Sequence, residues 1–135
     1  MEKAVFLYDY TGLMAKPWLD AGFECWCFDG QHEPGILRDG LHVKVGMWLH
    51  PTSAEAIKLI VGDGVKFVFG FPECTDLTVA GARHWKRKEL DNPRFQIEAM
   101  ELADLVRQVG ELCESPWAFE NPVGALSTLY RKPDF

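Results

Sequence analysis

The sequence lacks any long hydrophobic run at its start. The first apolar stretch, Ala4 to Tyr8, has five residues before Asp9 interrupts it. This is too short for a signal peptide or a membrane-spanning helix. We therefore expect a cytoplasmic protein with no membrane partner, in which the four cysteines stay reduced.

Metal-binding motifs are also lacking. The four histidines, at positions 32, 42, 50 and 84, include no close pair with the spacing of zinc ligands, so we expect no metal. Three of the cysteines are predicted to be core residues, because Cys25 and Cys27 alternate within an apolar run and Cys113 lies on a helical apolar stripe. Cys74 differs from them, since it lies in a polar segment.

Positive charge is scarce. The chain has 14 Lys and Arg against 20 Asp and Glu, a net charge of −6, which argues against a protein that coats nucleic acid non-specifically. One local basic patch stands out, with four Lys or Arg in six residues and a tryptophan among them. Such a patch suits a phosphate backbone and an unstacked base, and it equally suits a solvated helix start. Its members are Arg83, Trp85, Lys86, Arg87 and Lys88.

The length and composition indicate one globular domain. A chain of 135 residues that is 47% apolar and 25% charged has room for a single hydrophobic core. We therefore treat residues 1–135 as one domain.

Short apolar runs predict strands that alternate with helices. Strands are expected at Ala4–Tyr8, at Glu24–Phe28, around Val43 and Val45, at Lys66–Phe69 and at Pro116–Phe119. Helices are expected at Leu13–Ala21, after a capping box at Thr52–Glu55, and from Asn92, with a loop at Gln31–Gly40. This order predicts an α/β fold, a single open and mostly parallel sheet with helices on both faces.

Polar residues follow several of these strands. In an open parallel sheet, ligands bind beyond the carboxyl ends of the strands, where Gly12 would let a backbone approach a ligand and Asp29 suits ribose hydroxyls. An ordinary strand-to-helix turn explains the first loop equally well. The segments concerned are Asp9–Gly12, Asp29, Pro72–Asp76 and Glu120–Asn121.

Cys74 is a candidate nucleophile, because it directly follows a buried strand in a polar loop where backbone N–H groups can lower a thiol pKa. Glu120, after the neighbouring strand, could hydrogen-bond or protonate a base held beside that thiol. A surface cysteine and a helix-capping glutamate are the alternatives.

In order, these motifs resemble the catalytic half of the S-adenosylmethionine-dependent DNA cytosine-5 methyltransferases, most closely their short phage-encoded relatives. The matching segments are Tyr8-Asp9-Tyr10-Thr11-Gly12, Ala21-Gly22-Phe23, Asp29, Gly70-Phe71-Pro72-Glu73-Cys74 and Glu120-Asn121-Pro122. The resemblance implies a shortened Rossmann-like methyltransferase fold. It implies S-adenosylmethionine as cofactor, held by Tyr8, Asp9, Gly12, Asp29 and Pro72.

The resemblance further implies that Cys74, Glu120 and Asn121 form the catalytic set, with Cys74 attacking carbon 6 of a flipped cytosine. DNA would be contacted through the basic patch, and no target-recognition domain is expected within these 135 residues. Glu73 stands where the family has proline. The alternative is therefore a catalytically reduced binding module for the donor, a nucleotide or a host protein, such as a phage anti-defence protein. Either protein could form a homo-oligomer.

Overall fold

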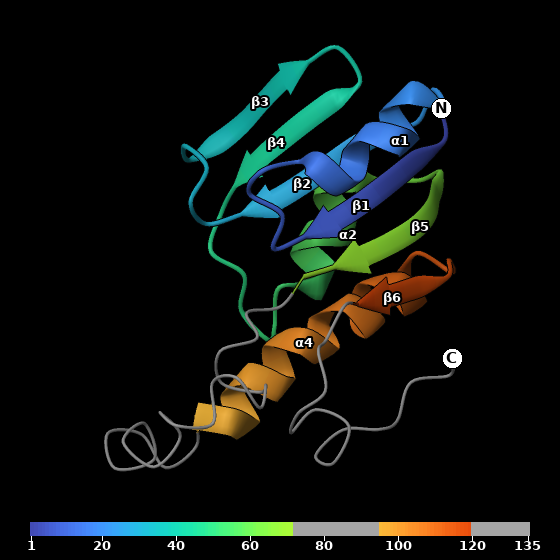
Figure 1. Cartoon of the computed structure of the whole chain (residues 1–135). Coiled ribbons are helices and arrows are strands. Elements are labelled where there is room, and N and C mark those ends of the chain that lie inside the picture. Colours follow the sequence, from blue (N-terminus) through green and yellow to red (C-terminus); the bar gives the residue numbers. More distant parts are fainter. Residues whose placement is uncertain (72–94, 120–135) are drawn as a thin grey trace.

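The computed structural model describes residues 1–71 and 95–119. Figure 1 shows a twisted sheet with helices packed against it. The strands are β1 (Lys3–Leu7), β2 (Glu24–Asp29), β3 (Gly35–Asp39), β4 (His42–Gly46), β5 (Val65–Gly70) and β6 (Trp117–Phe119). The helices are a 3-10 turn η1 (Leu13–Ala15), α1 (Lys16–Asp20), α2 (Ala54–Val61) and α4 (Phe95–Leu112).

The six described strands form one mixed sheet in the order β3-β4-β2-β1-β5-β6. Neighbouring strands from β4 to β6 pair in parallel, and only β3 is antiparallel to its neighbour β4. The prediction of an α/β protein with a mostly parallel sheet is confirmed.

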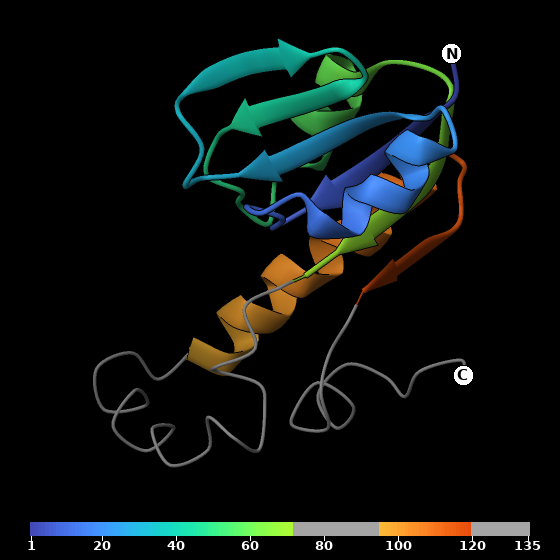
Figure 2. The same ribbon diagram turned by 45° about the horizontal axis from the view of Figure 1, so that its top comes forward.

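Helices cover both faces of this sheet. Figure 2 shows η1 and α1 on one face, with α2 and α4 on the other. Side chains alternate along the strands, so β1 contributes Val5 and Leu7 to the α2/α4 face and Ala4 and Phe6 to the α1 face. The described helices include none long and apolar enough to cross a bilayer.

The cysteine and helix predictions agree with this core. Cys25 and Cys27 are fully buried on the α1 face, and Cys113 packs against the α2/α4 cluster as a free thiol. On α4, Val106 and Val109 of the predicted apolar stripe are fully buried against the sheet.

Gln31–Gly40 was predicted to be a loop, and this is wrong. Residues 35–39 form β3, in a regular antiparallel register from Gly35↔Gly46 to Asp39↔His42. All five β3 residues are exposed, so no buried face marks the strand. Its sequence, Gly-Ile-Leu-Arg-Asp, also lacks the alternation of apolar and polar residues by which a half-buried strand is recognised. Backbone pairing with β4 holds it, and Gly40 turns the chain in a left-handed conformation at φ 61°.

The predicted capping box of α2 does not form. Ser53 occupies the N-cap position without a side-chain bond to the helix. Its Oγ instead accepts the backbone N–H of His50 at 2.9 Å. The hydroxyl is therefore used by the turn that precedes the helix, a local bond that competes with capping.

Candidate functional site

The order in which strands are added to the sheet reverses at β1, which lies between β2 and β5 and is parallel to both. After β1 the chain continues to β2, which pairs with one edge of β1, and β5 later pairs with the other edge. In open parallel sheets, ligands bind outside the carboxyl ends of the strands at such a switch point. The strands β1, β2 and β5 end there at Leu7, Asp29 and Gly70.

The loop after β1 is held by a buried carboxylate. Asp9 is 5% exposed, and its Oδ1 accepts the N–H of Gly12 at 2.9 Å. Its Oδ2 lies 3.9 Å from the Sγ of Cys27, whose pKa is raised by burial and by this carboxylate. Asp9 thus turns inward and fixes the loop, so a ligand would meet the loop backbone and not this carboxylate.

Gly12 is required by both conformation and space. Its φ is +74°, in the left-handed region, and a Cβ at this position would lie 2.9 Å from Cε1 of His42. The Nε2 of His42 is buried with no hydrogen-bond partner in the described structure. Burial and the charge of Lys44 lower the pKa of His42, which favours a neutral ring packed under the loop.

Tyr8 anchors the same loop to the opposite face of the sheet. Its φ is 60°, unusual for a residue with a side chain, and its hydroxyl donates to the carbonyl of Leu102 on α4. Burial raises the pKa of Tyr8, so the hydroxyl stays protonated. The loop is therefore held from both faces, by Asp9 and by Tyr8.

Asp29 ends β2 with one carboxylate oxygen available. It is half-buried, and its Oδ1 accepts the N–H of Gln31 at 2.8 Å. No hydrogen bond to Oδ2 is made by residues 1–71 or 95–119. A free, oriented carboxylate oxygen at this edge can accept a hydrogen bond from a ligand hydroxyl.

Three aromatic rings, which are not among the predicted site residues, lie in the loops that follow β1, β2 and β4. Tyr10 stacks on His32, with ring centroids 5.3 Å apart and planes inclined by 26°. His32 donates from Nε2 to the carbonyl of Asp9 at 3.3 Å, which joins the loops after β1 and β2.

Trp48 is the third ring. It is 69% exposed and lies against Gly30, where a Cβ would be 2.2 Å from Trp48 Cε3. The contact between Trp48 and Gly30 depends on the pairing between β2 and β4, so the local sequence does not show it.

The ends of β5 and β6 are paired, with Gly70 opposite Phe119. Phe71 also donates its N–H to the carbonyl of Leu7 at 3.0 Å, so the chain leaves β5 beside the end of β1. The remaining predicted site residues lie outside the described residues. They are Pro72, Cys74, Glu120, Asn121, and the basic-patch residues Arg83, Trp85, Lys86, Arg87 and Lys88.

In the described ranges, no three His, Cys, Asp or Glu side chains form a group that could hold a metal ion. Comparisons of the chain with protein-family models, with curated proteins and with solved structures find no match.

Proposed function

We propose that this protein binds S-adenosylmethionine at the carboxyl edge of β1 and β2, on a Rossmann-like methyltransferase fold. The observation that carries the proposal is the free Oδ2 of Asp29, next to a first loop that is fixed by Asp9 and tightened by Gly12. The parallel strands β4-β2-β1-β5-β6 follow the 3-2-1-4-5 order of nucleotide-binding folds. Within that order, an acid after the second strand binds ribose hydroxyls.

The site residues fit an adenosyl group. Asp29 can accept hydrogen bonds from the ribose, and the exposed ring of Trp48 offers a flat surface for a purine beside Gly30. The absence of a Cβ at Gly12 lets the loop after β1 approach a ligand closely. A bound donor would supply an electrophilic methyl group at this edge.

We further propose the DNA cytosine-5 methyltransferase reaction. Cys74 follows β5 by four residues, and Glu120 directly follows Phe119, the partner of Gly70 in the β5–β6 register. The Cys74 thiolate would add to carbon 6 of a flipped cytosine, with Glu120 and Asn121 holding the base. Carbon 5 would then take the methyl group, and loss of its proton would expel the thiolate.

Donor binding is tested by calorimetric titration with S-adenosylmethionine. The wild-type chain is expected to bind, and Asp29→Ala to bind roughly 10-fold more weakly or worse, because a charge-assisted hydrogen bond is lost. Asp20→Ala removes the same charge from the exposed end of α1 and should bind like the wild type. Absence of binding by the wild type, or equal affinities for both variants, would overturn the donor site.

Catalysis is tested with DNA that contains 5-fluorocytosine, in the presence of labelled donor. Because fluorine at carbon 5 blocks the final elimination, an active enzyme is expected to leave a covalent adduct on the intact-mass spectrum. The adduct should be lost in Cys74→Ala.

The second candidate function is a binding module that does not methylate. It is favoured by Glu73, whose negative charge next to Cys74 opposes thiolate formation. Donor binding without any adduct is the outcome that supports this module and contradicts the enzyme. A gain of adduct in Glu73→Pro would identify Glu73 as the cause.

A further inference from the structure

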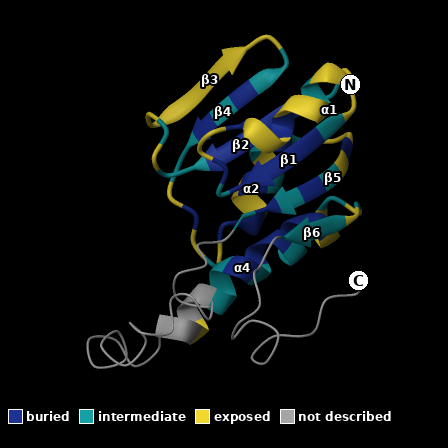
Figure 3. Cartoon of the chain, in the orientation of Figure 1, coloured by how far each residue is buried: buried dark blue, intermediate teal, exposed yellow. Residues whose placement is uncertain are grey.

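The edge strand β3 presents an open pairing surface. Figure 3 shows the strand exposed along its whole length, and each of its five residues is exposed. Ile36 and Leu37 are 59% and 63% exposed, although both are aliphatic. Among the described strands, β3 pairs only with β4, so its outer N–H and C=O groups face away from the sheet.

This edge lacks three of the features by which proteins prevent edge pairing. The missing features are lysine within the strand, proline within the strand and a β-bulge that would twist it away. The sequence of β3 is Gly-Ile-Leu-Arg-Asp, and its register with β4 is unbroken. With no bulge and no proline, the strand can accept another strand along its outer side.

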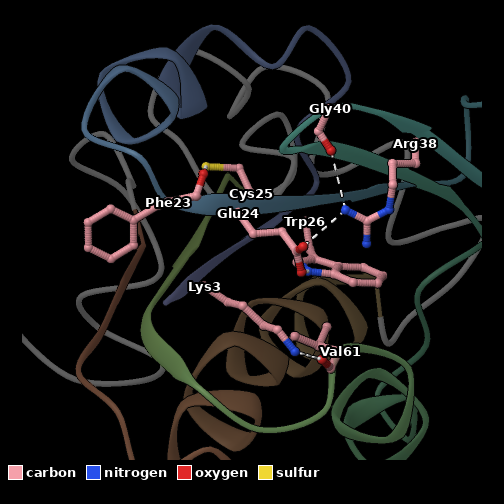
Figure 4. A network of polar contacts seen from close by, with 8 residues as sticks. All are labelled: Lys3, Phe23, Glu24, Cys25, Trp26, Arg38, Gly40 and Val61. Atoms are coloured by element: carbon pink, nitrogen blue, oxygen red, sulfur yellow. Dashed lines mark hydrogen bonds and ion pairs between the residues drawn. The ribbon is translucent and has the colours of Figure 1, made fainter. Parts of the chain in front are cut away.

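Its one basic side chain turns inward. Nη1 of Arg38 lies 3.0 Å from Oε2 of Glu24 and donates to the carbonyl of Gly40 at 3.2 Å. The guanidinium carbon lies 5.7 Å from the ring centroid of Trp26. Figure 4 shows Arg38 between Gly40 and the side chains of Glu24 and Trp26. Arg38 therefore links β3 to β2 across the intervening strand β4 and leaves the outer edge open.

We propose that β3 is an interface between two copies of this chain, which pair antiparallel about a two-fold axis at Leu37. Directly opposed residues of two antiparallel strands point to the same face of the sheet. A two-fold axis normal to the sheet must therefore lie midway between one residue and its own copy. When the axis lies between the two Leu37 residues, all five residues of each strand are paired. Leu37 then lies opposite its copy, and Ile36 lies opposite Arg38. Centring on Arg38 would pair fewer residues and oppose two like charges, which is destabilising.

Charge and size determine how strong this dimer is. The strand has one Arg and one Asp, so it is locally neutral although each chain carries −6. Five paired residues on each side are far fewer than the roughly 20–30 of a stable interface. The dimer should therefore dissociate on dilution, and salt should strengthen it by screening the net repulsion.

Sedimentation velocity over a concentration series tests the interface. The wild-type chain is expected to shift toward twice its 15.3 kDa mass as concentration rises. Leu37→Lys should raise the dissociation constant roughly 10-fold or more, because two ammonium groups would face each other. The control is Leu59→Lys, at an 82% exposed position on α2, which should dimerise like the wild type. A monomeric wild type at all concentrations, or an equal loss in both variants, would overturn the proposal.

Cysteine cross-linking tests the register, and it does not depend on the folding of Leu37→Lys. Directly opposed residues of antiparallel strands have Cα atoms within disulfide range. Leu37→Cys should therefore form a covalent dimer on mild oxidation, absent from the parent chain, in which the peptide carrying position 37 is linked to itself. Ile36→Cys lies opposite Arg38 and should not. Equal yields from the two variants would contradict the proposed register.

Discussion

At the scale of single residues, buried carboxylates carry much of the local order. Asp9 holds the loop after β1 through Gly12, and Glu24 accepts from Nε1 of Trp26 at 2.8 Å and from Arg38 at 3.0 Å. Both are buried. A buried charge is costly unless its hydrogen bonds are made, so each carboxylate is committed to its partners.

Asp9→Ala is expected to lower the free energy of unfolding by about 1–3 kcal/mol, because the N–H of Gly12 would be buried without an acceptor. Urea denaturation followed by tryptophan fluorescence measures the change. Asp9→Asn keeps an acceptor oxygen at the same place and should recover most of the loss. An alanine variant as stable as the wild type would show that the loop does not depend on this bond.

Glu24 should make stability depend on pH in the acid range. Burial by itself would raise the pKa of Glu24, but the hydrogen bonds from Trp26 and Arg38 and the charges of Arg38 and Lys3 together lower it. A lowered folded-state pKa stabilises the protein above the ordinary value of about 4.3. That stabilisation is lost as pH falls through the lower folded-state pKa.

Comparing urea denaturation at about pH 7 and about pH 3 measures this contribution. The wild type should lose more stability on acidification than Glu24→Gln, since glutamine does not titrate. If both chains lose the same stability, other carboxylates account for the acid sensitivity. Glu111→Gln, at an exposed position on α4, serves as the control.

At the scale of elements, α4 approaches the sheet where β5 has no side chain. A Cβ at Gly70 would lie 2.2 Å from Cγ2 of Val106, and both residues are buried. Interiors are close-packed, so this contact sets how near α4 lies to the end of β5. The same strand end leads into the segment that carries Cys74.

Gly70→Ala is expected to destabilise the protein by about 1–3 kcal/mol through overpacking. Val106→Ala removes the methyl groups that the new Cβ would meet. In a double-mutant cycle, the double variant should therefore be less destabilised than the sum of the two single variants. Additive losses would show that α4 adjusts without cost.

At the scale of the whole molecule, protection is greatest at the centre of the sheet. β1 and β2 have strands on both sides and core clusters on both faces. β3 lies at an edge with every residue exposed. Local opening should therefore cost least at β3 and most at β1 and β2.

Hydrogen exchange followed by mass spectrometry checks this ordering. Amides of β1 and β2 are expected to exchange only through global unfolding, and those of β3 roughly 10-fold faster or more. At protein concentrations that favour the proposed dimer, exchange in β3 should slow while β1 and β2 stay unchanged. Protection of β3 equal to that of β1 at low concentration would contradict this ordering.

The carboxyl edge is where the predicted and the observed site can be compared. The positions of Asp9–Gly12 after β1 and of Asp29 at the end of β2 follow from the sequence, since they directly follow recognisable apolar runs. The inward orientation of Asp9 does not, because it depends on Cys27, 18 residues away. The contact between Trp48 and Gly30 likewise depends on the register of β4 against β2.

The types of the buried elements, from the core strands to the apolar stripe of α4, could be predicted from the sequence alone, because hydrophobic periodicity is a local property. The strand order, the existence of β3, the stacking of Tyr10 on His32 and the contact of Trp48 with Gly30 became visible only in the folded chain. Each depends on contacts between residues far apart in the chain, and β3 in addition buries no side chain that could mark it. Edge pairing is a property of the backbone, which every sequence shares, so an exposed strand becomes visible only once its neighbour is in place.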